Sequence, residues 1–211
     1  MSEILLTILV PTVPSRINYF YPRIMKQLLE QTKKYSNIEL LTFFDNKKRT
    51  IGEKRDDMLK LAKGKYVTFI DDDDRISDDY VDEIMNAITN NDVDCIVYNT
   101  ICCENNGTPY LCKYGIEFAY GRNNEGWTGK PAHTMIWRRS IASKHKFKNV
   151  GWGEDIDWVK RAYLDIKTQH RIDKVLYYYD QNNGTTETRG VPDSVISDNI
   201  KKLIAKKENN N

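Results

Sequence analysis

The sequence predicts an α/β protein with a mostly parallel central sheet flanked by helices. In the first half, short apolar runs alternate with amphipathic segments in the order strand, helix, strand, helix. The apolar runs are nearly continuous, as expected for parallel strands that are buried on both faces. The chain has 211 residues, of which 40% are hydrophobic and 11% aromatic, enough for one domain with a substantial core.

Four strands and three helices are expected in the first 100 residues. The strands cover 4–10, 38–44, 65–70 and 94–99. The helices cover 19–35, 53–64 and 77–91. Each helical segment carries apolar residues three or four positions apart, which is the period of a helix with one buried face. We expect Gly64 to end the second helix and Ser77 to cap the start of the third.

The second half is less regular. Residues 101–131 are rich in Gly, Asn and Tyr and predict loops with at most a hairpin. After them we expect four elements: a strand running into a helix at 133–142, a Gly-rich turn and helix at 151–166, a strand at 172–180, and a terminal helix at 193–207. The three consecutive tyrosines at 177–179 are interpreted as strand packing.

Composition excludes several classes of protein. The formal net charge of +2 gives no reason to expect binding to nucleic acid. No apolar run approaches the roughly 18 residues of a membrane span, and the N-terminus reads as a strand instead of a signal peptide. The four cysteines have no metal-binding spacing, and they are Cys95, Cys102, Cys103 and Cys112. We therefore expect reduced thiols and a cytoplasmic protein.

Polar residues follow three of the predicted strands. The first strand ends in "VPTVPSR", the second in "FFDNKK" and the third in "FIDDDD". Ligands of open parallel sheets bind beyond the carboxyl ends of the strands, where these three segments come together. A sheet that binds no ligand also needs polar turns, so one such segment alone indicates little. Three of them at the same edge of the sheet indicate a binding site.

The third segment contains four consecutive aspartates, residues 71–74. Two like charges about 4 Å apart repel by roughly 1 kcal/mol in water and about 4 kcal/mol at an effective dielectric near 20. A divalent cation offsets such a cost, and Mg²⁺ or Mn²⁺ bound through one or two carboxylates would suit a nucleotide diphosphate. A solvated acidic turn is the alternative. Asp78 and Asp79 have a separate explanation, since acids are favoured at the start of a helix.

Four stretches in this order resemble a family 2 glycosyltransferase of the GT-A (Rossmann-like) fold. They are "ILLTILVPT", "IELLTFFDN", "GEKRDDMLKLAKGKYVTFIDDDD" and "GWGEDIDW". The resemblance covers residues 4–98 well and 132–180 loosely. It implies one GT-A domain over 1–211. The parts would be a nucleotide-sugar-binding half at 1–100, an acceptor and catalytic half at 101–192, and a helix with a polar tail at 193–211, which can lead to further domains.

The resemblance also implies roles in the first half of the chain. Pro11 and Thr12 would line the nucleotide pocket, and Asp45 would accept hydrogen bonds from the base. Arg55 would lie near the nucleotide or the acidic loop. Within that loop, Asp71 would face the ribose or a metal-bound water, and Asp73 would bind the metal. Because four aspartates permit a shift by one position, Asp72 is a further nucleotide-sugar candidate and Asp74 stays ambiguous.

In the second half, the resemblance implies that Asp155 is the catalytic base. The residues alone leave a choice among Glu154, Asp155 and Asp157, and all three can instead be acids favoured at a helix start. Trp127 and Trp152, next to glycines, can stack on an acceptor sugar or serve in packing. His133 can face the pyrophosphate, contribute to the acceptor site or be structural.

Together these assignments imply a metal-dependent inverting glycosyltransferase with Mn²⁺ or Mg²⁺ as cofactor. It would move a sugar from a nucleotide diphosphate, which we expect to be UDP, to a hydroxyl of a glycan or glycoconjugate acceptor. Two alternatives remain open: a module that binds a nucleotide sugar without turnover, and a haloacid-dehalogenase-like phosphatase. The phosphatase is disfavoured because its Asp-x-Asp usually follows the first strand, whereas the acidic run here follows the third.

Overall fold

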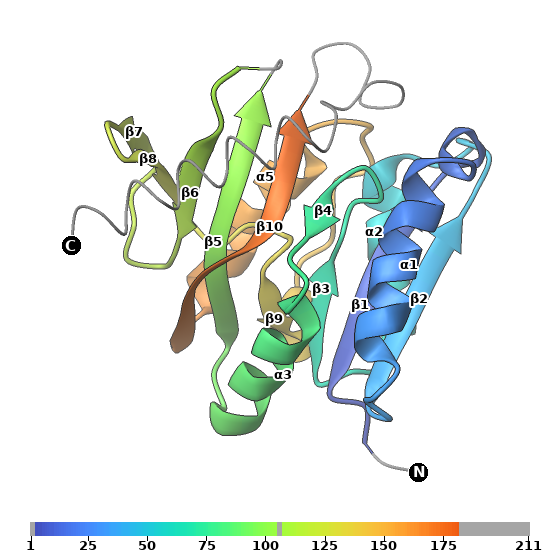
Figure 1. Ribbon diagram of the computed structural model, residues 1–211, viewed down its shortest axis with the longest axis horizontal. Coiled ribbons are helices and arrows are strands. Elements are labelled where there is room, and N and C mark those ends of the chain that lie inside the picture. Colours follow the sequence, from blue (N-terminus) through green and yellow to red (C-terminus); the bar gives the residue numbers. More distant parts are fainter. Residues whose placement is uncertain (1–2, 105–106, 182–211) are drawn as a thin grey trace.

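The computed structural model describes residues 3–104 and 107–181, which form one sheet with helices on both faces (Figure 1). The main path through the sheet runs β2-β1-β3-β9-β5-β6-β8-β7, and β10 pairs with β5 and β4. The strands are β1 Leu6–Thr12, β2 Ile38–Phe44, β3 Tyr66–Phe69, β4 Arg75–Ile76, β5 Cys95–Glu104, β6 Tyr110–Tyr114, β7 Gly121–Asn123, β8 Gly126–Gly129, β9 Ile136–Arg138 and β10 Gln169–Gln181. The helices are η1 Pro14–Arg16, α1 Phe20–Thr32, α2 Ile51–Leu61, α3 Tyr80–Asn90, α4 Arg139–Ala142, α5 Glu154–Ala162 and η2 Tyr163–Asp165.

The longest ladders in the sheet are parallel, which confirms the predicted fold class. β1 pairs with β2 on one side and β3 on the other, and β10 pairs with β5, all in parallel. The short strand β9 runs opposite to both β3 and β5, so β5 and β10 point the same way as β1, β2 and β3. The carboxyl ends of all five strands therefore meet at one edge, the upper edge in Figure 1.

Two helical layers bury this sheet. α1 packs with α3 on one face, and α2 packs with α5 on the other (Figure 1). The strand β1 lies between β2 and β3, and its Leu6, Ile8 and Leu9 are fully buried. On the α5 side, Trp158 stacks on Phe147 at 4.9 Å between ring centroids. This packing holds the start of α5 close to the upper edge of the sheet.

Two predicted helix caps are wrong. α2 ends at Leu61 with Ala62 as its C-cap. Gly64 instead lies against β1, where a Cβ would come within 2.5 Å of the Thr7 nitrogen. The third helix, α3, begins at Tyr80, and Ser77 stands before it, donating its hydroxyl to Asp79 Oδ1 at 2.7 Å. Tertiary contacts hold both residues outside the helices, since Gly64 lies against β1 and the backbone of Ser77 bonds to Leu176 and Gln31.

The second half contains more strand than the sequence predicts. Residues 110–129 form β6, β7 and β8, although they were expected to be mainly loop. The described cysteines are all buried, and no disulfide joins them; Cys95 is a fully buried small side chain, as expected. Within 3–104 and 107–181, no helix has the length and apolar character needed to cross a bilayer. The predicted helix at 193–207 lies outside the described residues.

Candidate active site

A cavity of about 650 Å³ opens at the upper edge of the sheet, beyond the carboxyl ends of β1, β2 and β3. We call it the first cavity. Its volume falls in the range of about 300 to 1,000 Å³ that small-molecule sites occupy. Its lining comes from the end of β1 and the loop after it, the loop before α2 and the start of α2, the acidic loop after β3, the start of α5, and β10. These residues include Pro11, Thr12, Arg16, Lys54, Arg55, Asp71, Asp73, Trp152, Glu154, Asp155 and Tyr179.

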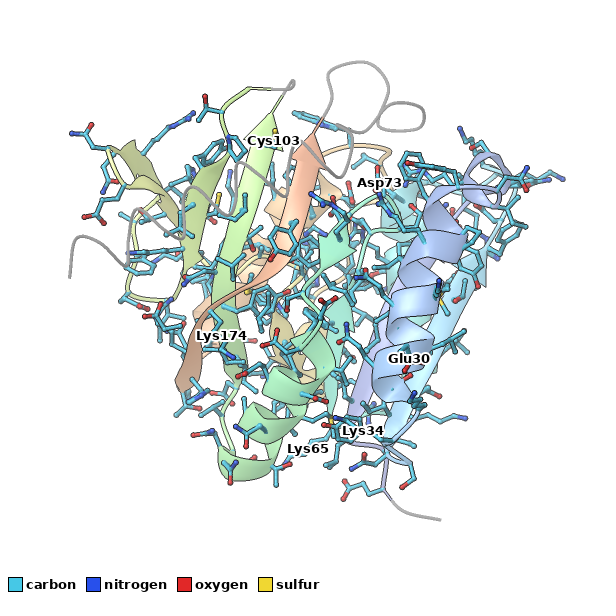
Figure 2. All side chains as sticks on the ribbon, viewed as in Figure 1. Glu30, Lys34, Lys65, Asp73, Cys103 and Lys174 are labelled. Carbon is cyan, nitrogen blue, oxygen red and sulfur yellow. The ribbon has the colours of Figure 1, made fainter. Side chains whose placement is uncertain are left out.

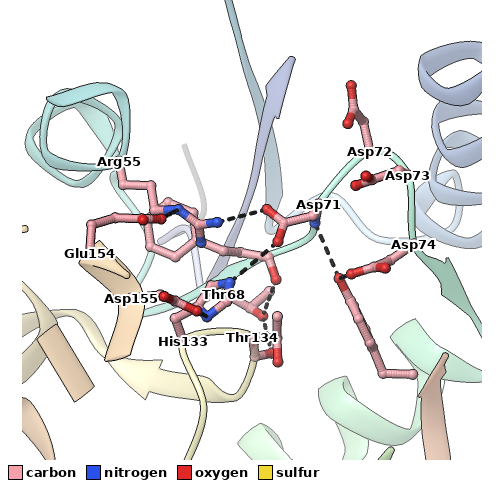
Figure 3. Close-up of polar contacts among 12 residues, drawn as sticks. Arg55, Thr68, Asp71, Asp72, Asp73, Asp74, His133, Thr134, Glu154 and Asp155 are labelled. Atoms are coloured by element: carbon pink, nitrogen blue, oxygen red, sulfur yellow. Dashed lines mark hydrogen bonds and ion pairs between the residues drawn. The ribbon is translucent and has the colours of Figure 1, made fainter. Parts of the chain in front are cut away.

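The four aspartates alternate in direction. Asp71 and Asp73 line the first cavity, whereas Asp72 and Asp74 are buried away from it. The backbone turns tightly here, since the Asp74 nitrogen donates to the Asp71 carbonyl at 3.1 Å. Asp73 lies at the upper edge of the sheet in Figure 2, and the close-up shows the loop leading from Asp71 to Asp74 (Figure 3). The structure thus separates two carboxylates that can reach a ligand from two that hold the loop.

Asp72 fastens the acidic loop to the loop after β1. The Thr12 hydroxyl donates to Asp72 Oδ2 at 2.5 Å, and the Arg16 guanidinium donates to Asp72 Oδ1. Arg16 also reaches Asp73, with 3.0 Å between Nη2 and Oδ2. Asp72, predicted to contact the nucleotide sugar, therefore has two protein partners and is not among the residues that line the first cavity.

Asp74 fastens the loop to the opposite side, where β10 runs. The Tyr177 hydroxyl donates to Asp74 Oδ2 at 2.6 Å and accepts from the Asp71 backbone nitrogen at 3.2 Å. From α1, the Arg23 guanidinium donates to the carbonyls of Asp73 and Asp74 at 2.7 and 3.0 Å. The loop is thus held from α1, from β10 and from the segment after β1.

Negative charge in this loop is only partly neutralised. Burial raises the pKa of Asp73, the charge of Arg16 lowers it, and Asp71 and Asp72 raise it again, to about 7. Burial also raises the pKa of Asp72 against the opposing effect of Arg16. A carboxylate with so high a pKa gains from any additional cation placed beside it.

Arg55 joins the acidic loop to α5. Its side chain is 5% exposed, and its Nη2 lies 2.9 Å from Asp71 Oδ1 while its Nε lies 3.3 Å from Glu154 Oε1. The guanidinium also packs over the Phe69 ring at 5.2 Å. Burial opposes ionisation of the Asp71 carboxyl, but the charges of Arg55 and His133 outweigh it and hold the pKa of Asp71 well below its usual range. Arg55 thus lies beside the acidic loop, and its contact with a nucleotide stays a prediction.

Asp155 enters the cavity from the first turn of α5. Gly153, with φ of 76°, makes the turn that starts this helix. Of the three acids at the helix start, Glu154 turns to Arg55, and Asp157 pairs with Arg161 and Lys148. Asp155 remains 32% exposed, with its Oδ2 at 3.3 Å from His133 Nδ1. Glu154 borders the same cavity but is 5% exposed, so Asp155 is the more accessible of these two acids, and it lies beside His133 in Figure 3.

His133 lies between Asp155 and Asp71. Its Nε2 is 3.5 Å from Asp71 Oδ2, on the other side of the ring from Asp155. Burial and the charge of Arg55 lower the pKa of His133, but the two carboxylates prevail and raise it above its usual value. Burial would raise the pKa of Asp155, but the hydrogen bond and charge of His133, with Arg55, lower it to about 2. Asp155 is therefore ionised at neutral pH, the state that a general base needs.

Asp45 accepts hydrogen bonds from the loop that follows it and from α2. Its carboxylate accepts from the backbone nitrogens of Lys47 and Arg49 at 3.3 and 3.1 Å, and from Lys54 Nζ at 3.0 Å. It is not among the residues that line the first cavity, although Lys54 is. Contact between Asp45 and a base stays a prediction.

The two candidate tryptophans lie in different places. Trp152 is 86% exposed and lies at the first cavity. Trp127 lies in β8 and lines a second cavity of about 410 Å³, which also contains His133 and shares Asp155 and Ile156 with the first. Asp155 therefore stands where the two cavities meet.

The acidic loop fits a divalent cation of the kind that accompanies a diphosphate. In the described ranges, no group of three or more His, Cys, Asp or Glu side chains is arranged to hold a metal ion. Mg²⁺ and Mn²⁺ need fewer, because phosphate oxygens and water complete their coordination around one or two carboxylates. Asp71 and Asp73 both line the cavity, and burial, with the neighbouring carboxylates of Asp71 and Asp72, raises the pKa of Asp73, so a cation beside it would favour its charged form. The donor set thus suits a cation shared with phosphates.

Several residues of this site were not singled out from the sequence. Arg16, Lys54 and Tyr179 line the first cavity, and Tyr177 holds the acidic loop. Arg16 stands in "VPTVPSR", and a basic residue after the first strand, expected at the same edge as the four aspartates after the third strand, was a usable signal. Tyr177 and Tyr179 carried no such signal, because alternate side chains of a strand point to opposite faces and the sequence does not say which face is the site.

Comparisons with known proteins found a matching family and similar solved structures. The profile of the family described as "Glycosyl transferase family 2" matches residues 22–151. The crystal structure of S. aureus TarS 1–349 is similar, with TM-score 0.59 and 17% identity over 83% of this chain and 60% of that one. Its complex with UDP-GlcNAc has TM-score 0.59 and 15% identity over 94% of this chain and 65% of that one.

The complex of TarS 1–349 with UDP has TM-score 0.55 and 16% identity over 82% of this chain and 60% of that one. The chain thus spans about 60% of the length of TarS 1–349. A search of curated proteins found no match. At these identities the structural likeness establishes a shared fold, which is the GT-A fold expected from the sequence.

Proposed function

Because the chain belongs to glycosyl transferase family 2, we propose that it transfers a sugar from a nucleotide diphosphate, with UDP favoured, to a hydroxyl of a glycan or glycoconjugate acceptor. The observation that carries the proposal is the position of Asp155. This carboxylate lines both cavities, so one side chain can meet a donor in the first and an acceptor in the second.

The first cavity has the features of a donor site. Pro11 and Thr12 would border the nucleotide, and Arg16, Lys54 and Arg55 bring positive charge to the same space. A diphosphate would lie toward Asp71 and Asp73, and a cation between them would offset the repulsion between these carboxylates and the phosphates. Mg²⁺ or Mn²⁺ held by these two carboxylates would offset the charge of the diphosphate. That S. aureus TarS 1–349 has been solved with UDP-GlcNAc and with UDP supports a uridine diphosphate donor.

Asp155 would act as the general base. It takes the proton of the acceptor hydroxyl while that oxygen bonds to the anomeric carbon of the donor sugar. The bond from the anomeric carbon to the diphosphate oxygen breaks on the opposite face, and the electron pair leaves with the diphosphate. A single displacement of this kind inverts the anomeric centre. His133 holds the carboxylate in place and ionised, through its 3.3 Å contact.

A module that binds a nucleotide sugar without turnover is the alternative to be separated by experiment. The phosphatase interpretation receives no support from the family match. Thermal-shift measurements with a panel of UDP-, TDP- and GDP-sugars, with and without Mn²⁺, would identify the donor, since a ligand bound by the folded state stabilises it. Release of the nucleoside diphosphate on prolonged incubation would then show turnover. Stabilisation without release, with every acceptor tried, would support the binding module and overturn transfer.

A further inference from the structure

Two cysteines lie in contact across neighbouring strands. Cys102 belongs to β5 and Cys112 to β6, and neither lines the first or the second cavity. In this antiparallel ladder Cys102 is opposite Tyr110, and Cys112 is opposite Thr100. The two cysteines are therefore diagonal neighbours on one face of the sheet, where side chains can reach each other. Their sulfur atoms are 2.9 Å apart.

The position of this pair suits a disulfide. A disulfide has an S–S distance of about 2.05 Å, so the two sulfurs need to approach by about 0.9 Å. The next residue, Cys103, points to the opposite face of the strand, and its Sγ donates to the Gly107 carbonyl at 3.3 Å. Cys95 lies at the start of β5 and is fully buried. The ladder thus brings Cys102, and not its neighbour in sequence, to Cys112.

The pair adjoins the aromatic wall of the second cavity. Tyr114 follows Cys112 by two positions on β6 and shares its face. Burial, and then the neighbouring thiols of Cys102 and Cys112, raise the pKa of the Tyr114 phenol. Trp127 in β8 is the register partner of Cys112, and its ring lies 5.4 Å from the Tyr114 ring. A covalent link between the two cysteines would therefore fix this wall to β5.

Both thiols are buried, but they lie in a short ladder. Cys102 is 6% exposed and Cys112 is 2% exposed. The pair formed by Cys102 and Tyr110 is the last in the register of β5 with β6. Local opening at the end of a ladder costs much less free energy than global unfolding. Such opening would expose Cys102 to a small reagent while the core of the sheet stays folded.

We infer that Cys102 and Cys112 are a reversible oxidation site, with a low-molecular-weight disulfide such as oxidised glutathione as the oxidant. The Cys102 thiolate attacks one sulfur of glutathione disulfide, whose S–S bond breaks, and one glutathione leaves. The Cys112 thiolate then attacks the Cys102 sulfur of this mixed disulfide, and the second glutathione leaves. Two protein thiols together lose two electrons and two protons, and one glutathione disulfide becomes two thiols. The site would operate whether or not the chain transfers a sugar.

A redox titration with peptide mapping tests the site. The full chain is equilibrated in glutathione buffers with an increasing oxidised fraction, quenched in acid and alkylated. It is then digested, without reduction, by a protease that cleaves after Glu. This separates residues 84–104, with Cys95, Cys102 and Cys103, from residues 105–117, with Cys112. We expect mass spectrometry to find the two peptides joined in oxidising buffer and separate after dithiothreitol.

Serine variants identify the partner of Cys112. Cys103→Ser and Cys95→Ser should keep the link between the two peptides, and Cys102→Ser should lose it. The oxidised parent protein should unfold roughly 5 °C above the reduced parent, taking the stabilisation by a short closed loop as a guide. Cys102→Ser should show no such difference between the two buffers. In concentrated urea the ladder is absent, and Cys103 should then compete with Cys102 for Cys112.

The outcomes decide the inference without reference to sugar transfer. If Cys112 of the folded protein is fully alkylated at every ratio of oxidised to reduced glutathione, the inference is overturned. A link that forms as well in Cys102→Ser as in the parent overturns it too. Fragmentation of the joined peptides from the parent distinguishes Cys102 from Cys103 directly, so the test holds even if Cys102→Ser does not fold. Fragments that place the link on Cys103 would likewise contradict the pairing.

Discussion

Arg55 and Glu154 lie side by side in the interior, with 3.3 Å between Nε and Oε1 and each side chain 5% exposed. The same guanidinium holds Asp71 at 2.9 Å on its other side. One cation from α2 thus links the acidic loop after β3 to the first turn of α5. The acidic loop supplies the carboxylates of the proposed donor site, and the first turn of α5 supplies the proposed base.

Replacing Arg55 should therefore destabilise the fold. Arg55→Met leaves Asp71 and Glu154 without their cation, and breaking a buried ion pair in this way costs about 3 to 5 kcal/mol. Urea unfolding followed by circular dichroism measures the loss. Arg49→Met is the matched control, because the Arg49–Asp57 pair is 41% and 29% exposed and such surface pairs contribute about 0 to 1 kcal/mol. Equal losses in the two variants would contradict the role given to Arg55.

Replacing the base should remove turnover and spare the donor. Asp155→Asn cannot accept the proton, so kcat should fall by about 10² to 10⁴. The dissociation constant of the nucleotide sugar, measured by calorimetry, should change little. Asp157→Asn serves as the control on the same helix, since Asp157 pairs with Arg161 and Lys148 outside both cavities. Transfer at the parental rate by Asp155→Asn would rule out this assignment.

The effect of a divalent cation on donor affinity should require Asp73. Calorimetric titration with a UDP-sugar should give tighter binding with Mn²⁺ than with EDTA in the parent protein, and Asp73→Asn should reduce that difference. Asp78→Asn removes an equal charge from an exposed position nearby and should keep it. If EDTA has no effect on donor affinity in the parent protein, the loop acts without a divalent cation.

Stability should fall in acid partly through Asp94. Its carboxylate accepts from the backbone nitrogens of Lys167 and Thr168 at 3.0 and 3.1 Å and from Arg138 Nε at 3.2 Å. Burial would raise the pKa of Asp94, but these hydrogen bonds lower it. A depressed folded-state pKa stabilises the protein above the unfolded value of about 3.9, and this contribution is lost as the pH falls through the folded value.

Asp94→Ala should therefore cost about 1.5 to 3 kcal/mol at neutral pH, the range for hydrogen bonds to a charged group. The difference from the parent should shrink as the pH falls from about 5 towards about 3. Urea titrations across this range measure it, with the exposed Asp78→Ala as control. A difference that stays constant with pH would mean that the charge of Asp94 does not contribute.

The elements that position the site were predictable because their signals are local. β1, β2 and β3 are apolar runs followed by polar residues, and α1 and α3 carry a helical period. The strands β4, β7 and β8 were not predictable, since they have two to four residues each and all three residues of β7 are exposed. Their pairing is decided by the neighbours that the rest of the fold brings to them.

The carboxylates of the site were predictable from the sequence, but the role of each carboxylate was not. Which of the four aspartates face the cavity depends on Arg16, Thr12 and Tyr177, and Tyr177 is 103 positions away from its partner Asp74. The contact between His133 and Asp155 likewise joins two separate segments of the chain, and no local pattern indicates that they meet. These roles depend on contacts between residues far apart in the sequence, and the spacing of residues within a motif does not indicate such contacts.

The acidic loop is anchored from α1, from β10 and from the segment after β1 before any ligand arrives. Its carboxylates are thus preorganised, and the conformational entropy of ordering them is lost during folding and not during capture of a cation. Selectivity among divalent ions should then follow the fixed spacing of Asp71 and Asp73, and loosening an anchor such as Tyr177→Phe should broaden that selectivity before it abolishes binding.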